Sequence, residues 1–302
     1  MNIEHSLNSH NIVQQSIPLA QPKSWRTWLI GRPLATADAP NQTIGKLIGL
    51  AVFSSDALSS VAYAPQELLL ILAGAGTAAF NFALPLAFGI IALLTILTLS
   101  YEQTIHAYPG GGGAYIVARD SLGELPAQTA GAALLTDYIL TVAVSISSGV
   151  AQIVSAYPTI YPYRVWIAVT MVGFITIINL RGVKESGATF AIPTYFFIVM
   201  MYLTVIVGLV RYLTGSLGVV VNPPDLTTNL IQPLSFFLIL KAFSSGTSAL
   251  TGVEAISNGI TAFKEPRSKN AGATLVIMSF ILGSLMLSIT FFQCRKKRPT
   301  ES

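Results

Sequence analysis

Long stretches without a charged residue dominate this sequence. Three of them run from Leu68 to Tyr101, from Ser186 to Val210 and from Asn270 to Cys294. Each exceeds the about 20 residues that an α-helix needs to cross a bilayer. Charged residues make up only 10% of the 302 residues and hydrophobic residues 52%, whereas about 25% of a soluble domain is charged. The sequence therefore predicts an all-α protein that crosses the membrane several times.

The rest of the composition excludes several classes of function. The net charge is +4, but Lys and Arg are spread between the apolar runs, so we expect no nucleic-acid partner. One cysteine, Cys294, and three histidines are too few for a disulfide framework or a cysteine-based metal site. We expect no cofactor and no enzymatic activity.

Charged, glycine and proline breaks between the apolar runs predict seven spans. A cytoplasmic leader of residues 1–43 is expected before this membrane domain of residues 44–293, and a basic tail of residues 294–302 follows it. The predicted spans cover residues 44–74, 80–105, 127–155, 163–180, 187–213, 234–263 and 271–293.

The basic residues indicate how the chain is oriented. Assigned to alternate loops, ten Lys and Arg fall on one side of the membrane and only Arg164 and Arg211 on the other. Because basic loops stay in the cytoplasm, we expect a cell-membrane protein with a cytoplasmic N-terminus. The seventh span would then carry Arg295-Lys296-Lys297-Arg298 outside, against this rule. We interpret this tail as foreign to the architecture and expect a truncated form of a longer protein; a natural end after an odd number of spans is the alternative.

Two of the predicted spans contain small and polar residues that interrupt an apolar helix. These residues lie in segments 50–63 and 243–254, and in both segments the interruption begins with Phe-Ser-Ser. The two spans cross the membrane in opposite directions. Such a pattern is typical of an inverted repeat with discontinuous first helices, and it predicts a binding site near the middle of the membrane.

Asp56 is the first candidate ligand. An ionised carboxylate inside a membrane costs several kcal/mol unless it is paired, solvated or protonated. Serine hydroxyls and carbonyls freed by the helix break would surround it with oxygen atoms, an arrangement that suits a hard cation and repels an anion. A protonated Asp56 bonded to a neighbouring helix is the structural alternative.

A polar stripe on the third span supplies further candidates. Asp137, Thr141 and Ser145 are spaced one helical turn apart, and Tyr138 adjoins them. Tyr63 lies two turns beyond Asp56; for both tyrosines ordinary packing is the alternative. Glu254 follows the second interruption and is the candidate proton carrier, or else the ion-pair partner of Lys241.

The glycine run of residues 108–115 resembles a phosphate-binding loop only superficially. It reads Tyr-Pro-Gly-Gly-Gly-Gly-Ala-Tyr and lacks the Lys-Ser/Thr that such loops require. We interpret it as a closely packed cytoplasmic loop in which glycine permits a tight approach of the backbone.

These motifs resemble those of the amino acid-polyamine-cation (APC) superfamily of transporters, and within it the KUP-related KimA-type potassium importers. The resemblance extends from about residue 29 to residue 292. It rests on four segments, at residues 54–63, 108–115, 136–141 and 248–258.

The resemblance implies a LeuT-like fold, here the first five-helix repeat plus the first two helices of the inverted second. It implies a potassium path lined by Asp56, Tyr63, Asp137, Tyr138, Thr141 and Thr251, with potassium held at Asp56, Asp137, Thr141 and Thr251. Potassium and a proton would be transported by symport within a lipid bilayer, with a second copy of the chain as a candidate partner in a homodimer. We expect the truncated chain itself to be inactive in transport and to show no saturable binding of potassium or rubidium.

Other functions compete with this interpretation. An amino acid permease, or a polyamine permease, is the main alternative, although Asp56 would repel a substrate carboxylate. An intramembrane aspartyl protease would need two facing aspartates, but Asp56 and Asp137 lack the Gly-x-Gly-Asp pattern. A binding or regulatory fragment without transport activity is a further alternative.

Overall fold

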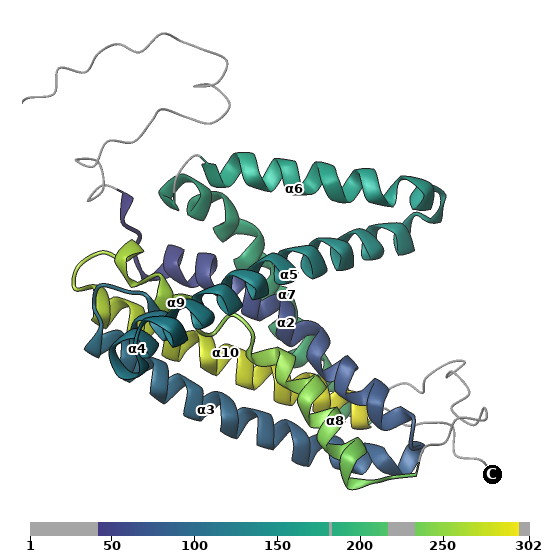
Figure 1. The fold of residues 1–302 in the computed structure, drawn as a ribbon. Helices are drawn as coiled ribbons and strands as arrows, with labels where there is room; N and C mark the ends of the chain where they lie inside the picture. The colour runs from purple at the N-terminus through teal and green to yellow at the C-terminus, as the bar shows by residue number, and fades with distance from the viewer. Residues whose placement is uncertain (1–41, 181–182, 217–232, 296–302) are drawn as a thin grey trace, which may run out of the picture.

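The structure is a computed structural model that describes residues 42–180, 183–216 and 233–295. The leader up to residue 41 and the tail from residue 296 lie outside these residues. The described chain is almost entirely helical (Figure 1). Its elements are α2 (Lys46–Ala73), η2 (Thr77–Phe82), α3 (Ala83–Ala107), α4 (Gly113–Leu122), α5 (Glu124–Ala156), η3 (Pro158–Tyr163), α6 (Arg164–Leu180), α7 (Val183–Leu213), α8 (Phe236–Gly246), η4 (Thr247–Leu250), α9 (Ala255–Asn258), η5 (Ile260–Ala262) and α10 (Arg267–Arg295).

Six helical segments in the described residues are long and apolar enough to cross a membrane, and each coincides with a predicted span. They are Lys46–Ala73, Ala78–Ala107, Glu124–Ala156, Pro158–Leu180, Ser186–Leu213 and Arg267–Gln293. The remaining predicted span, residues 234–263, is divided into α8, η4, a turn, α9 and η5. The all-helical membrane architecture is therefore confirmed.

The prediction of two interrupted spans is correct for residues 234–263 and wrong for the first span. α2 is one continuous helix of 28 residues through Asp56. The Ser55 hydroxyl donates to the Val52 carbonyl at 3.1 Å and the Ser59 hydroxyl to the Asp56 carbonyl at 2.7 Å, so these polar groups are satisfied within the helix. Gly252, by contrast, has φ +87°, a conformation that a right-handed helix cannot contain. The helical geometry is therefore interrupted at Gly252 and not at Asp56.

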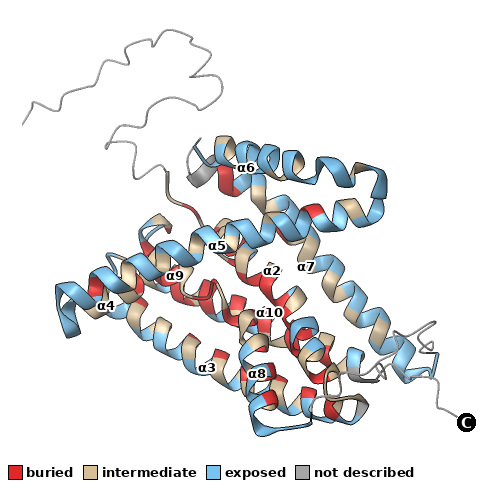
Figure 2. Cartoon of the chain, turned by 45° about the vertical axis from the view of Figure 1, so that its right-hand side comes forward, coloured by how far each residue is buried: buried red, intermediate tan, exposed pale blue. Residues whose placement is uncertain are grey.

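α2 forms the centre of the molecule. It contacts α10, α8, η4 and α7, while α3 packs against α10 and α8. Figure 2 shows that the buried residues concentrate on α2, α9 and α10. Leu68 and Leu72 of α2 are fully buried, as are Leu275 and Leu285 of α10. The interrupted segment, residues 247–262, packs against this core through Val253, Ile256 and Ile260, which are fully buried. Contact with protein is the setting in which irregular backbone is tolerated within a membrane.

α5 and α6 extend away from this core (Figures 1 and 2). None of the residues of α6, Arg164–Leu180, is buried, and α5 buries only Ala127 and Val150. Large apolar side chains are exposed along both helices, including Trp166, which is 72% exposed. A bilayer would cover these side chains with lipid.

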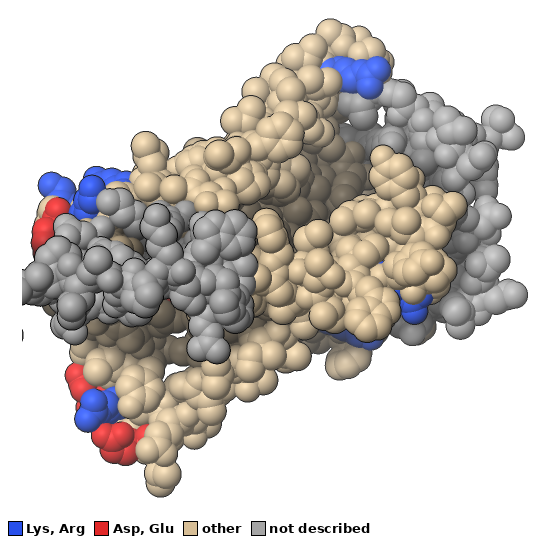
Figure 3. Space-filling view, turned by 90° about the horizontal axis from the view of Figure 1, so that it is seen from above, with Lys and Arg blue, Asp and Glu red and all other residues tan. Residues whose placement is uncertain are grey.

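Several loops meet at one end of the molecule. The amide of Ile44 donates to the Ala262 carbonyl at 2.8 Å, and the amide of Lys264 donates back to the Ile44 carbonyl at 2.9 Å. The amide of Gly112 donates to the Asn258 carbonyl at 3.4 Å. Most charged side chains visible in Figure 3 also gather at one end of the molecule.

Candidate functional site

The interrupted segment touches α2 at Asp56. At Gly252 an added Cβ would lie 2.9 Å from Asp56 Oδ2 and 3.1 Å from the amide nitrogen of Ala57. Only a residue without a side chain permits this approach, and the positive φ of Gly252 favours glycine for a second reason. The two segments predicted to form the site therefore meet, although one of them is an unbroken helix.

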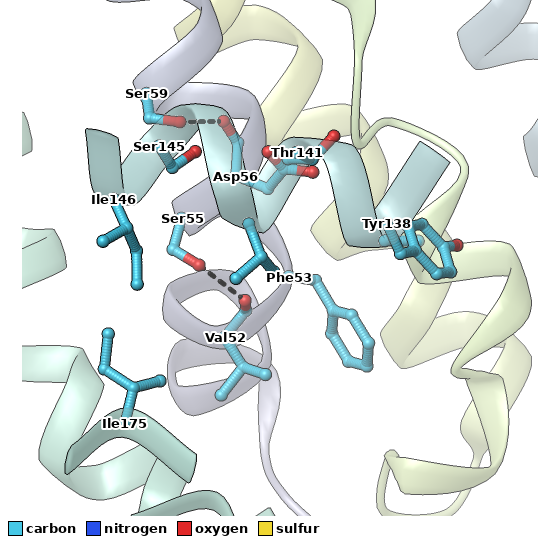
Figure 4. A pocket seen from close by; sticks show the side chains of 12 residues that line it. Val52, Phe53, Ser55, Asp56, Ser59, Tyr138, Thr141, Ser145, Ile146 and Ile175 are labelled. Carbon is cyan, nitrogen blue, oxygen red and sulfur yellow. Dashed lines mark hydrogen bonds between the residues drawn. The ribbon is translucent and has the colours of Figure 1, made fainter. Parts of the chain in front are cut away.

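A pocket of about 460 Å³ opens beside Asp56, between α2, α5 and α6 (Figure 4). Asp56, Ser55 and Ser59 line it from α2. Asp56 Oδ1 is buried and has no hydrogen-bond partner among the described residues. An acceptor left in this state is costly, so it is a ready ligand for a cation or a proton. The full lining is Val52, Phe53, Ser55, Asp56, Ser59, Tyr138, Thr141, Val142, Ser145, Ile146, Ile175 and Ala255.

A second pocket of about 480 Å³ contains the other predicted acidic residues. Asp137 of α5 and Glu254 of the interrupted segment line it together with Thr251. Asp137 is exposed and Glu254 is partly buried. The structure therefore brings Asp56, Tyr138 and Thr141 together in one pocket and Asp137, Thr251 and Glu254 in the other.

The three carboxylates make this region electronegative. Asp56 lines the first pocket, and Asp137 and Glu254 line the second. In the described residues the ion pairs found are His106–Glu102, Arg119–Glu124 and Arg267–Glu265, so none involves these carboxylates. Lys241 is exposed on α8 and forms no ion pair with Glu254 in this part of the chain. Uncompensated negative charge of this kind attracts cations.

The carboxylates do not converge on a single point. Among the described residues, no group of three His, Cys, Asp or Glu side chains is close enough to hold one metal ion. Tyr63 lies farther along α2, outside both pockets, and its hydroxyl donates to Ser60 Oγ at 3.5 Å. The candidate ligands thus form a series of positions rather than one cage.

Sequence reasoning missed two residues of this region. Tyr101, in the C-terminal half of α3, lines the pocket with Asp137 and Glu254. Asn258 donates through Nδ2 to the Tyr138 hydroxyl at 2.6 Å. Asn258 belongs to the polar segment 248–258, and Tyr101 ends an uncharged run. Their positions were visible in the sequence, but their partners lie on other helices.

Comparison with known proteins identifies a family and a relative of this chain. A family model described as amino acid permease matches residues 43–294. The chain is also 50% identical over 267 residues to a protein of Bacillus subtilis (strain 168) named potassium transporter KimA. That alignment covers 88% of this chain and 44% of the relative, so the chain spans less than half the length of the relative.

The match to the family covers most of the described helices and includes every residue of the two pockets. The chain belongs to the amino acid permease family of the APC superfamily.

Proposed function

We propose that this chain forms the cation-binding part of a transporter that takes up potassium by symport with protons. The observation that carries the proposal is the unpartnered, buried Oδ1 of Asp56 at the contact with Gly252. Negative charge and hydroxyl oxygens surround this atom and no positive side chain of the described chain is paired with it. The name of the Bacillus subtilis relative supports potassium as the cation.

The two pockets suggest two neighbouring positions for potassium. In the first, Asp56 supplies the carboxylate and Thr141 a hydroxyl, with Tyr138 at the wall. In the second, Asp137 supplies the carboxylate and Thr251 the hydroxyl. Tyr63, two turns along α2, is a further contact on the same path. Successive weak sites allow an ion both to enter and to leave, which transport requires.

Glu254 is the proposed proton carrier. It shares the second pocket with Asp137, and the segment that carries it contacts Asp56 at Gly252. Carboxylates gathered in this way repel one another when they are ionised. A cation bound between these groups reduces the repulsion, and a proton on Glu254 reduces it in the same way. Occupation by potassium and protonation of Glu254 are therefore energetically linked, as symport requires.

We further propose a location in the cell membrane with a cytoplasmic N-terminus. Lipid covers the exposed apolar faces of α5 and α6, and a second copy of the chain is the proposed partner. Asp137 is exposed in this chain, so the second pocket is open on the side of α5. Asp56, Tyr138 and Thr141 nevertheless line one pocket in this chain. In contrast to the expectation from the sequence, we therefore propose that the 302-residue chain binds potassium there, but does not transport it.

An amino acid permease is the second candidate function, because the family model carries that description. A substrate carboxylate is usually held by free N–H groups at a helix break. α2 is unbroken from Lys46 to Ala73, so its amides near Asp56 are engaged in the helix. The carboxylate of Asp56 would also repel an anionic group, which favours a cation.

The experiment is thermal unfolding of the purified chain in detergent at constant ionic strength, with potassium, rubidium, sodium or choline chloride. A ligand at 100 times its Kd stabilises the folded state by about 2.7 kcal/mol. That energy raises the Tm by about 5–10 °C in a domain of this size. We expect this shift with potassium and rubidium, its loss in Asp56→Asn, and its retention in Glu67→Gln, an exposed carboxylate on the same helix.

Equal Tm values in all four salts, or an unchanged potassium shift in Asp56→Asn, would refute the proposal. A larger shift with a zwitterionic amino acid than with potassium would favour the permease alternative. Proton-driven rubidium uptake by liposomes containing only this chain would show that binding and transport both reside in it.

A further inference from the structure

Asn258, at the end of α9, connects two parts of the molecule that are distant in sequence. Its Nδ2 donates to the hydroxyl of Tyr138, 120 residues away on α5, at 2.6 Å. Its carbonyl accepts from the amide of Gly112 in the glycine loop, which comprises residues 108–113, at 3.4 Å. Its Oδ1 is buried beside Gly113, without a hydrogen-bond partner among the described residues.

The glycine loop can approach Asn258 this closely only because the residues at the contact have no side chains. Gly111, Gly112 and Gly113 all have positive φ, at 80°, 100° and 45°. A Cβ on Gly113 would overlap Asn258 Oδ1 and lie 2.8 Å from Ser257 Oγ. Gly110, in the same loop, faces open space, with no atom within 4 Å of an added Cβ. The loop therefore fits closely against Asn258 at Gly113 but not at Gly110.

Tyr138 depends on this contact more than a tyrosine in a packed core would. It lines the pocket of Asp56 from α5, the helix that buries only Ala127 and Val150. Figure 4 shows Tyr138 at one side of the pocket, with Ile146 and Ile175 at the opposite side. A phenol hydroxyl can both donate and accept, so the bond to the Asn258 amide persists in either orientation of that amide.

We infer that Asn258 is a positioning residue that holds Tyr138 at the Asp56 pocket, and that the glycine loop in turn holds Asn258. The inference rests on the proposed cation-binding function of that pocket. Asn258 touches no ion itself; it acts through the orientation of Tyr138. A movement of the glycine loop away from α9 would release Tyr138 and change the wall of the pocket, which links a surface loop to ion binding.

A double-mutant cycle tests the connection between the two side chains. Asn258→Leu removes the amide at similar volume, and Tyr138→Phe removes only the hydroxyl. We expect each single variant of the full chain to lower the Tm by about 2–4 °C without potassium. The double variant should lower it no further than the worse single variant, because both changes remove one bond. Additive losses would overturn the inference, whether or not the chain binds potassium.

Potassium titrations separate positioning from simple stabilisation. The half-saturating potassium concentration is obtained from the dependence of the Tm on potassium. We expect it to rise about 5-fold in Asn258→Leu and in Tyr138→Phe, which is the effect expected for one lost hydrogen bond. A residue that is only structural would lower the Tm without moving this concentration, and that result would also overturn the inference. A wild-type chain whose Tm does not respond to potassium would refute the proposed function. The double-mutant cycle would still show whether Asn258 and Tyr138 are coupled.

The glycine loop is tested by a matched pair of substitutions. Gly113→Ala displaces Asn258, so Tyr138→Phe should cause no additional loss of Tm in that background. Gly110→Ala adds the same methyl group where space is free, so the full effect of Tyr138→Phe should remain. An undiminished effect of Tyr138→Phe in Gly113→Ala would show that the loop does not hold Asn258.

Discussion

Gly252→Ala tests the closest approach between the interrupted segment and α2. The new Cβ would lie 2.9 Å from Asp56 Oδ2 and 3.1 Å from the backbone nitrogen of Ala57. A carboxylate can rotate away, but the nitrogen of Ala57 is fixed in a continuous helix. The substitution therefore forces the segment and α2 apart, or moves the carboxylate that we propose as the ion ligand.

Two costs contribute to the expected effect. A side chain at φ +87° costs about 1–2 kcal/mol. Overpacking in a close contact costs about 1–3 kcal/mol more. Together they predict a loss of about 2–5 kcal/mol, which lowers the Tm by about 5–15 °C in a domain of this size.

The measurement is thermal unfolding in detergent, followed by tryptophan fluorescence. Gly173→Ala on α6 is the control, because an added Cβ there meets no atom within 4 Å and alanine favours a helix. We expect the control to have the wild-type Tm or a slightly higher one and to retain the potassium-induced shift of Tm. Gly252→Ala should have a lower Tm and no potassium-induced shift. A Gly252→Ala chain as stable as the control would refute the close packing of the segment on Asp56.

Two further predictions concern the core and the orientation of the chain. Phe263, which is fully buried and stacks on Phe53 with ring centroids 5.3 Å apart, should lose about 3–5 kcal/mol of stability on Phe263→Ala. The matched Phe236→Ala, at a side chain that is 75% exposed, should change stability by less than about 0.5 kcal/mol, and equal losses in the two variants would contradict the assigned core. Alkaline phosphatase fused after Gly76 should be active and fused after Gly123 inactive, because Gly76 follows the first spanning helix and Gly123 lies between the second and the third, on opposite sides in the predicted topology. The reverse pattern of activity would place the N-terminus outside the cell.

Much of the architecture could be predicted from local sequence properties. Long apolar stretches between charged, glycine and proline breaks indicate spanning helices without any knowledge of their neighbours, and six helical segments of the structure coincide with predicted spans. A carboxylate such as Asp56 inside a predicted span is equally conspicuous, because its burial is costly. The break at residues 247–254 could also be predicted, because serine, threonine and glycine gather at residues 244–252 within an apolar span.

The first span shows where such reasoning fails. The small and polar residues of segment 50–63 predict an interrupted helix, but α2 is continuous. Ser55 and Ser59 bond to carbonyls of their own helix, so polarity alone does not interrupt it. Whether a polar residue breaks a helix depends on the φ and ψ that it must adopt, and only tertiary packing reveals these angles.

Tertiary structure alone decided which candidates share a pocket. Asp56 and Thr141 line one pocket, while Asp137 and Thr251 line the other, although the sequence placed all four in one set. The bond between Asn258 and Tyr138 joins residues 120 positions apart. Hydrophobic pattern determines that a helix forms and lies in a membrane, because those properties depend on the segment itself. Which polar faces meet depends on how the helices pack against one another, and that is settled by contacts between distant segments.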